Sequence, residues 1–424
     1  MINTVRGTKD ILPEEIPLWY FVEKTLRQVS SLFGFKEIRT PIFEKTEVFL
    51  RSIGAETDIV NKEMYTFFDR GGDSITLRPE MTAPVVRAVI QNNLLAYDSL
   101  LRLWYYGPLF RYERPQKGRL RQFHQYGAEL IGSSEPEADA EIILLAKEIV
   151  ERLGIAEYKL LLNSIGNKAS RQQYKQQLIL YFEKYADCLS NESRERLKKN
   201  PLRILDSKDE RDLEIIKNCP KIYDYFDKES IEHYNRTKEL LALNNINFQE
   251  TPLLVRGLDY YTHTVFEFQS PLLGAQDSFG GGGRYNELFS EFGFKKEVPA
   301  IGFAFGIERI LLILESQHSI SYEESPYTYI AYNKPEFLPR VYELARLLRK
   351  NNIPTLFDMQ KKSLKAQMKD ANKYGVKFVI IIGDDEMKNN TITIKDMEKS
   401  LQNTYTSEKG IETILNSYLP NEDN

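Results

Sequence analysis

The chain has 424 residues, of which 42% are hydrophobic and 28% are charged, and its formal net charge is −4. These values are typical of a globular protein of roughly two or three domains, and the acidic balance does not indicate a nucleic-acid binder, although a local basic patch would suffice for one. No apolar stretch of about eighteen residues and no N-terminal apolar segment occurs, so we expect a soluble, cytoplasmic protein that does not associate with membranes.

The first expected element is a helix that ends at Gly34. Apolar residues recur at spacings of three and four, as on one face of an amphipathic helix. They are Trp19, Val22, Leu26, Val29 and Phe33. An extended run at residues 35–43 follows and contains Pro41, and a proline there indicates an edge strand or an interface.

The run Arg78-Pro79-Glu80-Met81-Thr82 follows a predicted strand at residues 75–77 and begins a predicted helix. Glu80 and Thr82 fall in the first helical turn, where a carboxylate and a hydroxyl meet spare backbone donors. Glu80 could equally accept hydrogen bonds from the ammonium group of a substrate, because an ionised carboxylate is an acceptor only. The sequence leaves both roles open.

Alternating residues between positions 100 and 131 predict an antiparallel hairpin. Its strands are expected at residues 101–106, 108–113 and 123–130. The loop between them contains four basic residues and no acidic one, namely Arg114, Lys117, Arg119 and Arg121. A solvated turn usually mixes its charges, so the loop favours contact with phosphate groups.

Residues 167–250 predict a helical insertion, because charged, helix-forming sequence interrupts a chain that otherwise reads as strands. The two cysteines, Cys188 and Cys219, lie in this segment without a CxxC pattern or a neighbouring histidine. That spacing indicates neither a zinc site nor a disulfide framework. The segment carries no functional signal of its own.

Three segments between residues 254 and 309 combine an arginine with glycines or with the pattern of a buried strand. The arginines are Arg256, Arg284 and Arg309. Buried charge without a partner is costly, so Arg256 either pairs with Asp259 in the core or belongs to a site for a polyanion. The recurrence favours a polyanion site. No Lys-Ser/Thr follows the glycines at 280–283, which excludes a phosphate-binding loop of the P-loop type.

Strands and helices alternate after Ser325 and predict a small α/β domain at residues 326–424. One predicted helix, residues 363–374, carries a lysine stripe. The stripe consists of Lys361, Lys365, Lys369 and Lys373. Such a stripe is usually a solvated face, but six lysines and one aspartate in residues 361–377 are enough for a nucleic-acid contact.

Taken together, these segments resemble the class II histidine-tRNA ligases along nearly the whole chain. The helix and strand ending at Pro41 resemble motif 1, residues 110–113 with the following loop and Phe123 resemble motif 2, and residues 306–309 resemble motif 3. Residues 254–261 and 282–285 resemble two peptides peculiar to the histidine enzymes. The chain departs from the family at Met81, where glycine is frequent, and at Asn286, where aspartate is frequent.

The resemblance implies an α+β catalytic domain built on an antiparallel sheet, of the class II synthetase type. Residues 1–166 and 251–325 would form it, residues 167–250 would be a helical insertion domain, and residues 326–424 an α/β anticodon-binding domain. The activity implied is attachment of L-histidine to histidine tRNA through histidyl-adenylate, with release of AMP and pyrophosphate. ATP would be a substrate accompanied by Mg²⁺, no metal would be bound by the protein itself, and the enzyme would be a homodimer.

The resemblance also implies roles for individual residues. Histidine would be bound by Glu80, Met81, Thr82, Gln125, Glu129, Tyr260 and Tyr261. ATP would be bound by Arg111, Glu113, Phe123, Arg256 and Arg309, of which Arg111 and Arg256 would be catalytic. The acceptor end of the tRNA would meet Arg114, Gln116 and Lys117.

Two hypotheses from other functional classes remain at this stage. One is a catalytically silent paralogue that acts as a histidine-sensing regulatory subunit, and the other is a tRNA-binding signalling module. Both would be expected to have lost phosphate-handling arginines, and the regulator normally lacks the anticodon-binding domain. The presence of Arg111, Arg256 and Arg309 together with a C-terminal α/β domain favours the enzyme.

Overall fold

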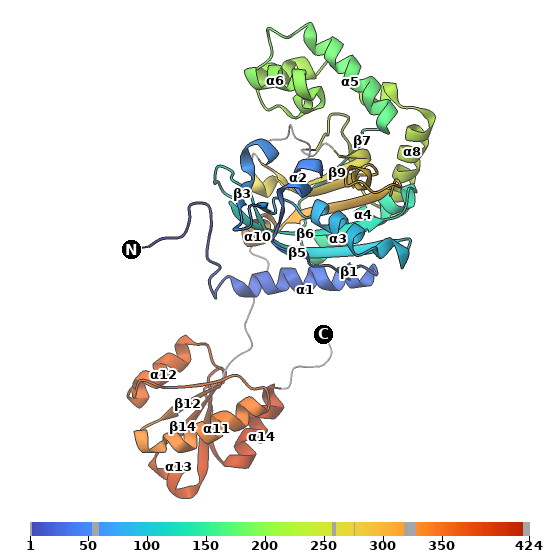
Figure 1. Cartoon of the computed structure of the whole chain (residues 1–424). Coiled ribbons are helices and arrows are strands. Elements are labelled where there is room, and N and C mark those ends of the chain that lie inside the picture. The colour runs from blue at the N-terminus through green and yellow to red at the C-terminus, as the bar shows by residue number, and fades with distance from the viewer. Residues whose placement is uncertain (1, 53–58, 257–259, 275, 318–327, 419–424) are drawn as a thin grey trace. The chain divides into compact units, whose positions relative to one another are not determined.

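The structure is a computed structural model of the chain and describes residues 2–52, 59–256, 260–274, 276–317 and 328–418 (Figure 1). It divides into two compact units, Met1–Ser321 and Tyr322–Asn424. Hydrophobic clusters lie within each unit, as expected for parts with separate cores. The division that the sequence predicts at Ser325 lies outside the described residues.

The first unit is built on an eight-stranded sheet of order β1-β5-β6-β11-β10-β9-β7-β8. The strands are β1 (Lys36–Glu37), β5 (Leu101–Phe110), β6 (Gln122–Ile131), β7 (Lys159–Ser164), β8 (Gln249–Glu250), β9 (Thr262–Gln269), β10 (Ser278–Arg284) and β11 (Ala300–Gly306). Pairing is antiparallel from β5 through β7, and only the two-residue edge strands β1 and β8 pair in parallel. The predicted antiparallel catalytic sheet is confirmed.

One face of this sheet is covered by three helices, α1 (Ile16–Leu32), α4 (Pro136–Arg152) and α10 (Ile307–Ser316). Their apolar residues share one cluster with every second residue of β6, namely Tyr126, Ala128 and Leu130. The residues between these point to the opposite face, because side chains alternate along a strand. Gln125 and Glu129 therefore lie on the face that α1, α4 and α10 leave open.

The opposite face is bordered by α3 (Thr82–Gln91) and by most of the helical segment that the sequence predicts at 167–250, whose last long helix packs instead with the covered face. That segment contains α5 (Lys168–Glu183), α6 (Asn191–Lys199), α7 (Glu210–Ile216), α8 (Lys228–Leu243) and the short 3₁₀ helices η3 (Pro201–Asp206) and η4 (Ile222–Tyr225). It belongs to the same compact unit as the sheet, and α8 packs on α4. Its turns can therefore contribute to a site on the open face.

Two predicted extended runs differ from the observed strands. Residues 35–43 do not form one strand, because β1 joins the main sheet while β2 (Phe43–Lys45) joins a small sheet of order β2-β4-β3, with Pro41 between them. That small sheet also contains β3 (Tyr65–Phe68) and β4 (Ser74–Leu77). Helix α2 (Thr46–Ser52) contacts this sheet, and α9 (Leu288–Glu291) contacts α2 and α3.

The predicted break between residues 106 and 108 is absent, because β5 runs without interruption through Gly107 and Pro108. Pro108 pairs with His124 of β6, and β1 reaches only Leu103 and Trp104 on the other side of β5. Pro108 thus lies where the strand has one neighbour, so its missing N–H group costs no ladder hydrogen bond.

The second unit has a five-stranded sheet of order β13-β12-β14-β15-β16. Its strands are β12 (Thr328–Tyr332), β13 (Thr355–Phe357), β14 (Phe378–Ile382), β15 (Thr391–Asp396) and β16 (Gln402–Thr406), and its helices are α11 (Leu338–Lys350), α12 (Leu364–Lys373), α13 (Asp384–Asn389) and α14 (Ser407–Tyr418). The first three strands are parallel, which confirms the predicted α/β class.

Helix α12 buries Ala371 against the sheet of the second unit. The four lysines of the stripe, Lys361, Lys365, Lys369 and Lys373, are all exposed. Within the described part of the chain, no helix combines the length and the apolarity that crossing a bilayer demands.

Candidate active site

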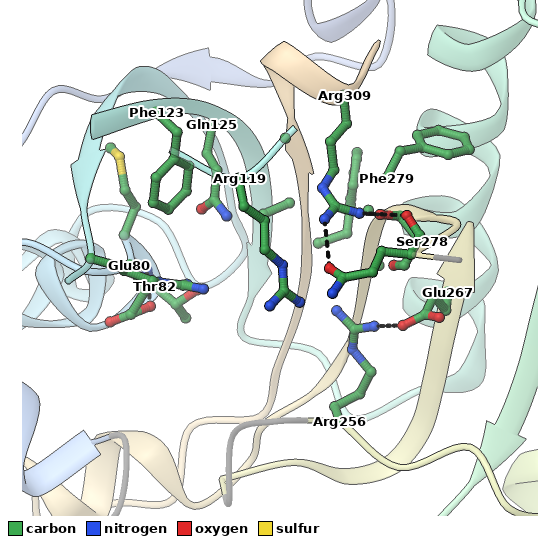
Figure 2. A pocket seen from close by; sticks show the side chains of 18 of the residues that line it. Glu80, Thr82, Arg119, Phe123, Gln125, Arg256, Glu267, Ser278, Phe279 and Arg309 are labelled. Atoms are coloured by element: carbon green, nitrogen blue, oxygen red, sulfur yellow. Dashed lines mark hydrogen bonds and ion pairs between the residues drawn. The ribbon is translucent and has the colours of Figure 1, made fainter. Parts of the chain in front are cut away.

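A cavity of about 580 Å³ lies on the open face of the main sheet. Residues from β5, β6, β9, β10 and β11, from the start of α3 and from the loop between β5 and β6 line it. Every residue predicted to bind histidine or ATP lines this cavity: Glu80, Met81, Thr82, Arg111, Glu113, Phe123, Gln125, Glu129, Arg256, Tyr260, Tyr261 and Arg309. Figure 2 shows Glu80 and Thr82 on one side of the pocket and Arg256 and Arg309 on the other.

Glu129 is the buried carboxylate of the first side and is 1% exposed. It accepts hydrogen bonds from the hydroxyl groups of Thr82 (2.9 Å), Tyr105 (3.0 Å) and Tyr285 (2.7 Å). Burial raises the pKa of Glu129 to about 7, although the three hydroxyl donors oppose that shift. A carboxyl group poised at neutral pH and aimed into a polar pocket is suited to binding a ligand N–H group.

Sequence reasoning missed Tyr105 and Tyr285 as parts of this network. Gly127 could have indicated that a side chain such as Tyr105 approaches β6 here, because a Cβ atom at Gly127 would lie 2.3 Å from the Tyr105 hydroxyl oxygen. A glycine on the ligand-facing side of a strand often marks the close approach of another group. The aromatic rings of Tyr260 and Tyr261, which are 4.8 Å apart, complete the wall, and Tyr260 also lies 5.8 Å from Tyr285.

Glu80 caps helix α3. Its carboxylate accepts hydrogen bonds from the backbone N–H groups of Thr82 (2.7 Å) and Ala83 (2.9 Å), which confirms the first of the two roles considered from the sequence. Burial raises its pKa to about 7, against the effect of these two donors. The carboxylate still faces the cavity, so capping does not exclude a contact with a ligand. Met81, beside it, is buried.

The two arginines of the opposite side are each held by protein groups. Arg256 forms an ion pair with Glu267, and Arg309 donates hydrogen bonds to the carbonyl oxygens of Gln276 (3.0 Å) and Ser278 (Figure 2). Such fixed guanidinium groups can meet phosphate oxygens with little loss of side-chain entropy.

Arg111 is held in the same way on the β5–β6 side of the cavity. Its Nε donates to the Pro79 carbonyl oxygen at 2.8 Å, and its guanidinium lies 5.3 Å from the Phe123 ring centroid. The hypothesis that Arg256 pairs with Asp259 concerns a residue outside the described part of the chain, since residues 257–259 are not described.

Arg119 is a further cation of the cavity wall. It pairs with Glu113 at 3.3 Å and lies between the two sides in Figure 2. Burial, followed by the positive charge of Arg119, lowers the pKa of Arg309 from its usual value. Two guanidinium groups that repel each other across a cavity favour binding of an anion between them.

Glycines bring the arginine side of the cavity close to the sheet. A Cβ atom at Gly281 would lie 3.1 Å from the guanidinium carbon of Arg256 and 2.5 Å from the carbonyl oxygen of Phe266. The glycines of β10 therefore leave space for Arg256 over the strand rather than forming a phosphate-binding loop.

Arg284 does not belong to the cavity, so the expectation that all three arginine segments form one polyanion site is wrong for this residue. Arg284 is fully buried, forms an ion pair with the fully buried Asp139, and donates to the carbonyl oxygens of Ser133 (2.7 Å) and Glu135 (3.0 Å). Asn286 lies 3.5 Å from it and accepts a hydrogen bond from the Ala300 N–H at 3.3 Å. An aspartate at 286 would place a second carboxylate beside Arg284, which Asp139 already neutralises.

The predicted tRNA-contacting residues Arg114, Gln116 and Lys117 lie in the exposed β5–β6 loop and not on the wall of the 580 Å³ cavity. Two backbone hydrogen bonds between Gln116 and Arg119, of 3.1 and 2.9 Å, shape the end of the loop. The Arg121 N–H donates to the Gly7 carbonyl oxygen at 2.7 Å, which ties the loop to the N-terminal segment.

Comparison with known proteins agrees with this geometry. Residues 7–310 match the family model "Histidyl-tRNA synthetase", and residues 328–417 match "Anticodon binding domain". The chain belongs to the histidyl-tRNA synthetase family. The Histidine–tRNA ligase of Cyanothece sp. is 47% identical over 93% of this chain and 91% of that protein, and that of Fervidobacterium nodosum is 45% identical over 95% of each. The structure of the apo histidyl-tRNA synthetase of S. aureus is similar with a TM-score of 0.83 and 37% identity, over 98% of this chain and 100% of that one.

The raised pKa values predict how histidine binding by this synthetase depends on pH. We predict that Glu80 and Glu129 meet the ammonium group and the imidazole N–H of histidine. Both carboxyl groups are protonated below about pH 7 in the empty cleft and would have to lose their protons first. The KM for histidine should therefore rise as the pH falls below 7, by about tenfold per pH unit for each proton released. Steady-state assays from pH 6 to 8.5 measure this, and the KM for ATP should change much less.

Glu129→Gln provides the control for this prediction. The amide still offers an oxygen acceptor but does not titrate, so the pH dependence of the histidine KM should be shallower. Titration of the imidazole of free histidine affects both proteins equally and cancels in the comparison. Equal slopes in the two proteins would refute the role of the Glu129 carboxyl group.

Proposed function

We propose that this chain attaches L-histidine to histidine tRNA in two steps, through histidyl-adenylate, with ATP as the source of free energy and AMP and pyrophosphate as products. The observation that carries the proposal is the polarity of one cavity. Its first side holds the buried Glu129 surrounded by hydroxyl groups, and its second side holds Arg256 and Arg309. A polar amino acid fits the first side and a polyphosphate the second.

Histidine is proposed to lie with its imidazole toward Glu129 and Tyr261 and its ammonium group toward Glu80, Thr82 and Gln125, with Tyr260 lining the same pocket. The support is that these side chains line the cavity and that Glu129 is already surrounded by donors that fix its orientation. A pocket that hydrogen-bonds its ligand rejects isosteres without matching polar groups, because its own buried groups would be left unpaired.

ATP is proposed to extend from Phe123, on the β5–β6 side of the cavity, to the arginine side. Phe123 would stack on the adenine ring, Glu113 would accept a hydrogen bond from the adenine amino group, and Arg309 would contact the far phosphates. The support is that the Phe123 ring already carries one guanidinium on its face and that the two cations at the far end, Arg119 and Arg309, lie close enough to repel each other.

Activation is then attack of the histidine carboxylate on the α-phosphorus of ATP. The P–O bond to the β-phosphate breaks, and its electron pair leaves with pyrophosphate. Arg111 and Arg256, from opposite walls of the cavity, are proposed to stabilise the charge that develops on the transferring phosphoryl group. Transfer to the terminal ribose of the tRNA follows. Neither step needs a side-chain nucleophile, so positioning and electrostatic stabilisation account for catalysis.

Mg²⁺ is proposed to enter with the β- and γ-phosphates. Within the described residues, no group of three or more His, Cys, Asp or Glu side chains could hold a metal ion by itself. Glu267 and Asp277 on the cavity wall supply carboxylate oxygens, which suit a hard cation that keeps phosphate oxygens among its ligands. When bound with ATP, the ion would neutralise negative charge on the phosphates.

Outside the cavity, we propose that the exposed lysines of α12 contact the anticodon stem of the tRNA and that the enzyme is a cytoplasmic homodimer. The support for the dimer is a group of exposed apolar residues beside motif 1, on or next to the small β2-β4-β3 sheet. They are Ile42, Phe43, Phe67 and Phe68.

The regulatory and signalling alternatives find no support, since the phosphate-side arginines are retained and the relatives carry the name Histidine–tRNA ligase.

Arg256 provides the direct test of the catalytic proposal. Removing one fixed donor to developing charge typically costs about 10²- to 10³-fold in rate, so Arg256→Ala should slow histidine-dependent exchange of pyrophosphate into ATP by at least that factor. Arg152→Ala, on an exposed arginine of α4, is the matched control and should leave exchange unchanged. Thermal unfolding of both variants checks that they fold. A fully active Arg256→Ala protein would contradict the proposal.

The β5–β6 loop generates a second prediction, about the tRNA. Histidine tRNA carries an extra guanosine at its 5′ end, and the exposed side chains of Arg114 and Gln116 can donate hydrogen bonds to a base edge. Arg114→Ala and Gln116→Ala should leave pyrophosphate exchange nearly intact, yet reduce the preference for this tRNA over one without the extra nucleotide.

Lys117→Ala is the comparison, because a lysine that contacts a phosphate should weaken both tRNAs about equally. Aminoacylation assays with the two tRNAs separate base recognition from charge. A preference for the extra guanosine that survives in both Arg114→Ala and Gln116→Ala would place its recognition elsewhere.

A further inference from the structure

The helical segment contributes two charged residues to the wall of the catalytic cavity. Asp206 ends η3 and Lys208 lies between η3 and α7, and both line the 580 Å³ cavity. The same two residues, together with Arg119 and Gln276, also line a second cavity of about 490 Å³. The turn 206–208 therefore lies at the boundary between the arginine side of the cleft and an adjoining space between the helical segment and the loops that carry Arg119 and Gln276.

The conformation of this turn directs both charges to the same side. Ser207 is extended, with φ −68° and ψ 141°, so the side chains of its two neighbours project opposite to its own. Ser207 is buried in the helical segment, whereas Asp206 and Lys208 are exposed. The alternation agrees with their place on the cavity wall.

A buried carboxylate of the helical segment fixes the turn. Asp212 is fully buried and accepts hydrogen bonds from the hydroxyl groups of Ser190 (2.7 Å), Ser193 (2.6 Å) and Ser207 (2.6 Å). These hydroxyl donors keep the pKa of Asp212 below its usual value despite burial. The network touches no residue that contacts histidine or adenine, so its evident effect is to hold Ser207, and with it the direction of Asp206 and Lys208.

Among the described residues that line the second cavity, Lys208 is the cation for which no ion pair with a carboxylate is found. Its neighbours Arg196 and Arg211 form ion pairs with Glu192 and Asp209, while none of the ion pairs among the described residues includes Lys208. Arg256 and Glu267 line the same cavity as Asp206 and Lys208, which places the turn toward the arginine side of the cleft. An exposed ammonium group at this edge is available to a phosphate that leaves the cleft.

We propose that the turn Asp206–Lys208 is a contact site for the pyrophosphate product. Lys208 binds oxygens of the pyrophosphate, which leaves with the electron pair of the broken bond to the α-phosphorus. The Asp206 carboxylate repels the pyrophosphate. Together the two charges set how readily this product is released. The proposal rests on the synthetase function described above and adds the helical segment to the first half-reaction.

The test is the KM for pyrophosphate in histidine-dependent exchange with ATP. Lys208→Ala should raise it by about tenfold, Lys208→Arg should largely restore it, and Asp206→Asn should lower it, while the KM for histidine stays unchanged in all three. Lys217→Ala, an exposed lysine of the same segment paired with Glu214 away from the cavities, is the matched control and should change neither constant.

Three outcomes would overturn the inference: an unchanged pyrophosphate KM in Lys208→Ala, an equal change in Lys208→Ala and Lys217→Ala, or a defect confined to transfer onto tRNA. The last would assign the lysine to the tRNA instead. Absence of any histidine-dependent exchange in the unaltered protein would refute the synthetase function itself, so the two failures are distinguishable.

Discussion

The site depends on the register of β6 with its two neighbours. Glu129 lies opposite Leu103 of β5 and Gly302 of β11, and a Cβ atom at Gly302 would lie 1.6 Å from a carboxylate oxygen of Glu129. A slip of one residue would turn Tyr126, Ala128 and Leu130 into the cleft and drive Glu129 into the apolar core, away from the hydroxyl groups that bind its carboxylate, and burial of a carboxylate without them is costly. The core under α1, α4 and α10 therefore fixes the same register that presents the carboxylate to the ligand.

The cavity has two sides of different electrostatic character, and a pair of ligands bound next to each other can occupy both. On the first side, burial raises the pKa of Glu80 and Glu129 to about 7, so these groups gain from a cationic or N–H donor ligand. On the second side, Arg309 has its pKa lowered by burial and by Arg119, so it gains from an anion. In the proposed complex, the ammonium group and imidazole of histidine satisfy the first side and the triphosphate of ATP satisfies the second, and the cleft is accordingly polar where most ligand pockets are apolar.

Much of this arrangement could be predicted from the sequence, because it rests on local patterns and on motifs that resemble a family. The alternation in β5 and β6 and the βα alternation after residue 328 reflect side-chain periodicity, which the sequence displays directly. Arg284 shows the limit of the motif argument. Its neighbours resemble those of Arg256, yet it is buried on Asp139, a residue more than a hundred positions away in the chain.

Long-range contacts of this kind also account for the other residues that were missed. Tyr105 and Tyr285 reach Glu129 only through sheet pairing, and Asp206 and Lys208 reach the cleft only through the packing of the helical segment on the sheet. No local periodicity carries that information.

If one cavity selects histidine and activates it with ATP, the selectivity is measurable as amino-acid-dependent exchange of pyrophosphate into ATP. Each standard amino acid is supplied alone to the purified protein at equal concentration. We expect histidine to support exchange far above every other amino acid, including glutamine and asparagine, which resemble it in polarity. Comparable exchange with any other amino acid, or no exchange with histidine, would contradict this expectation.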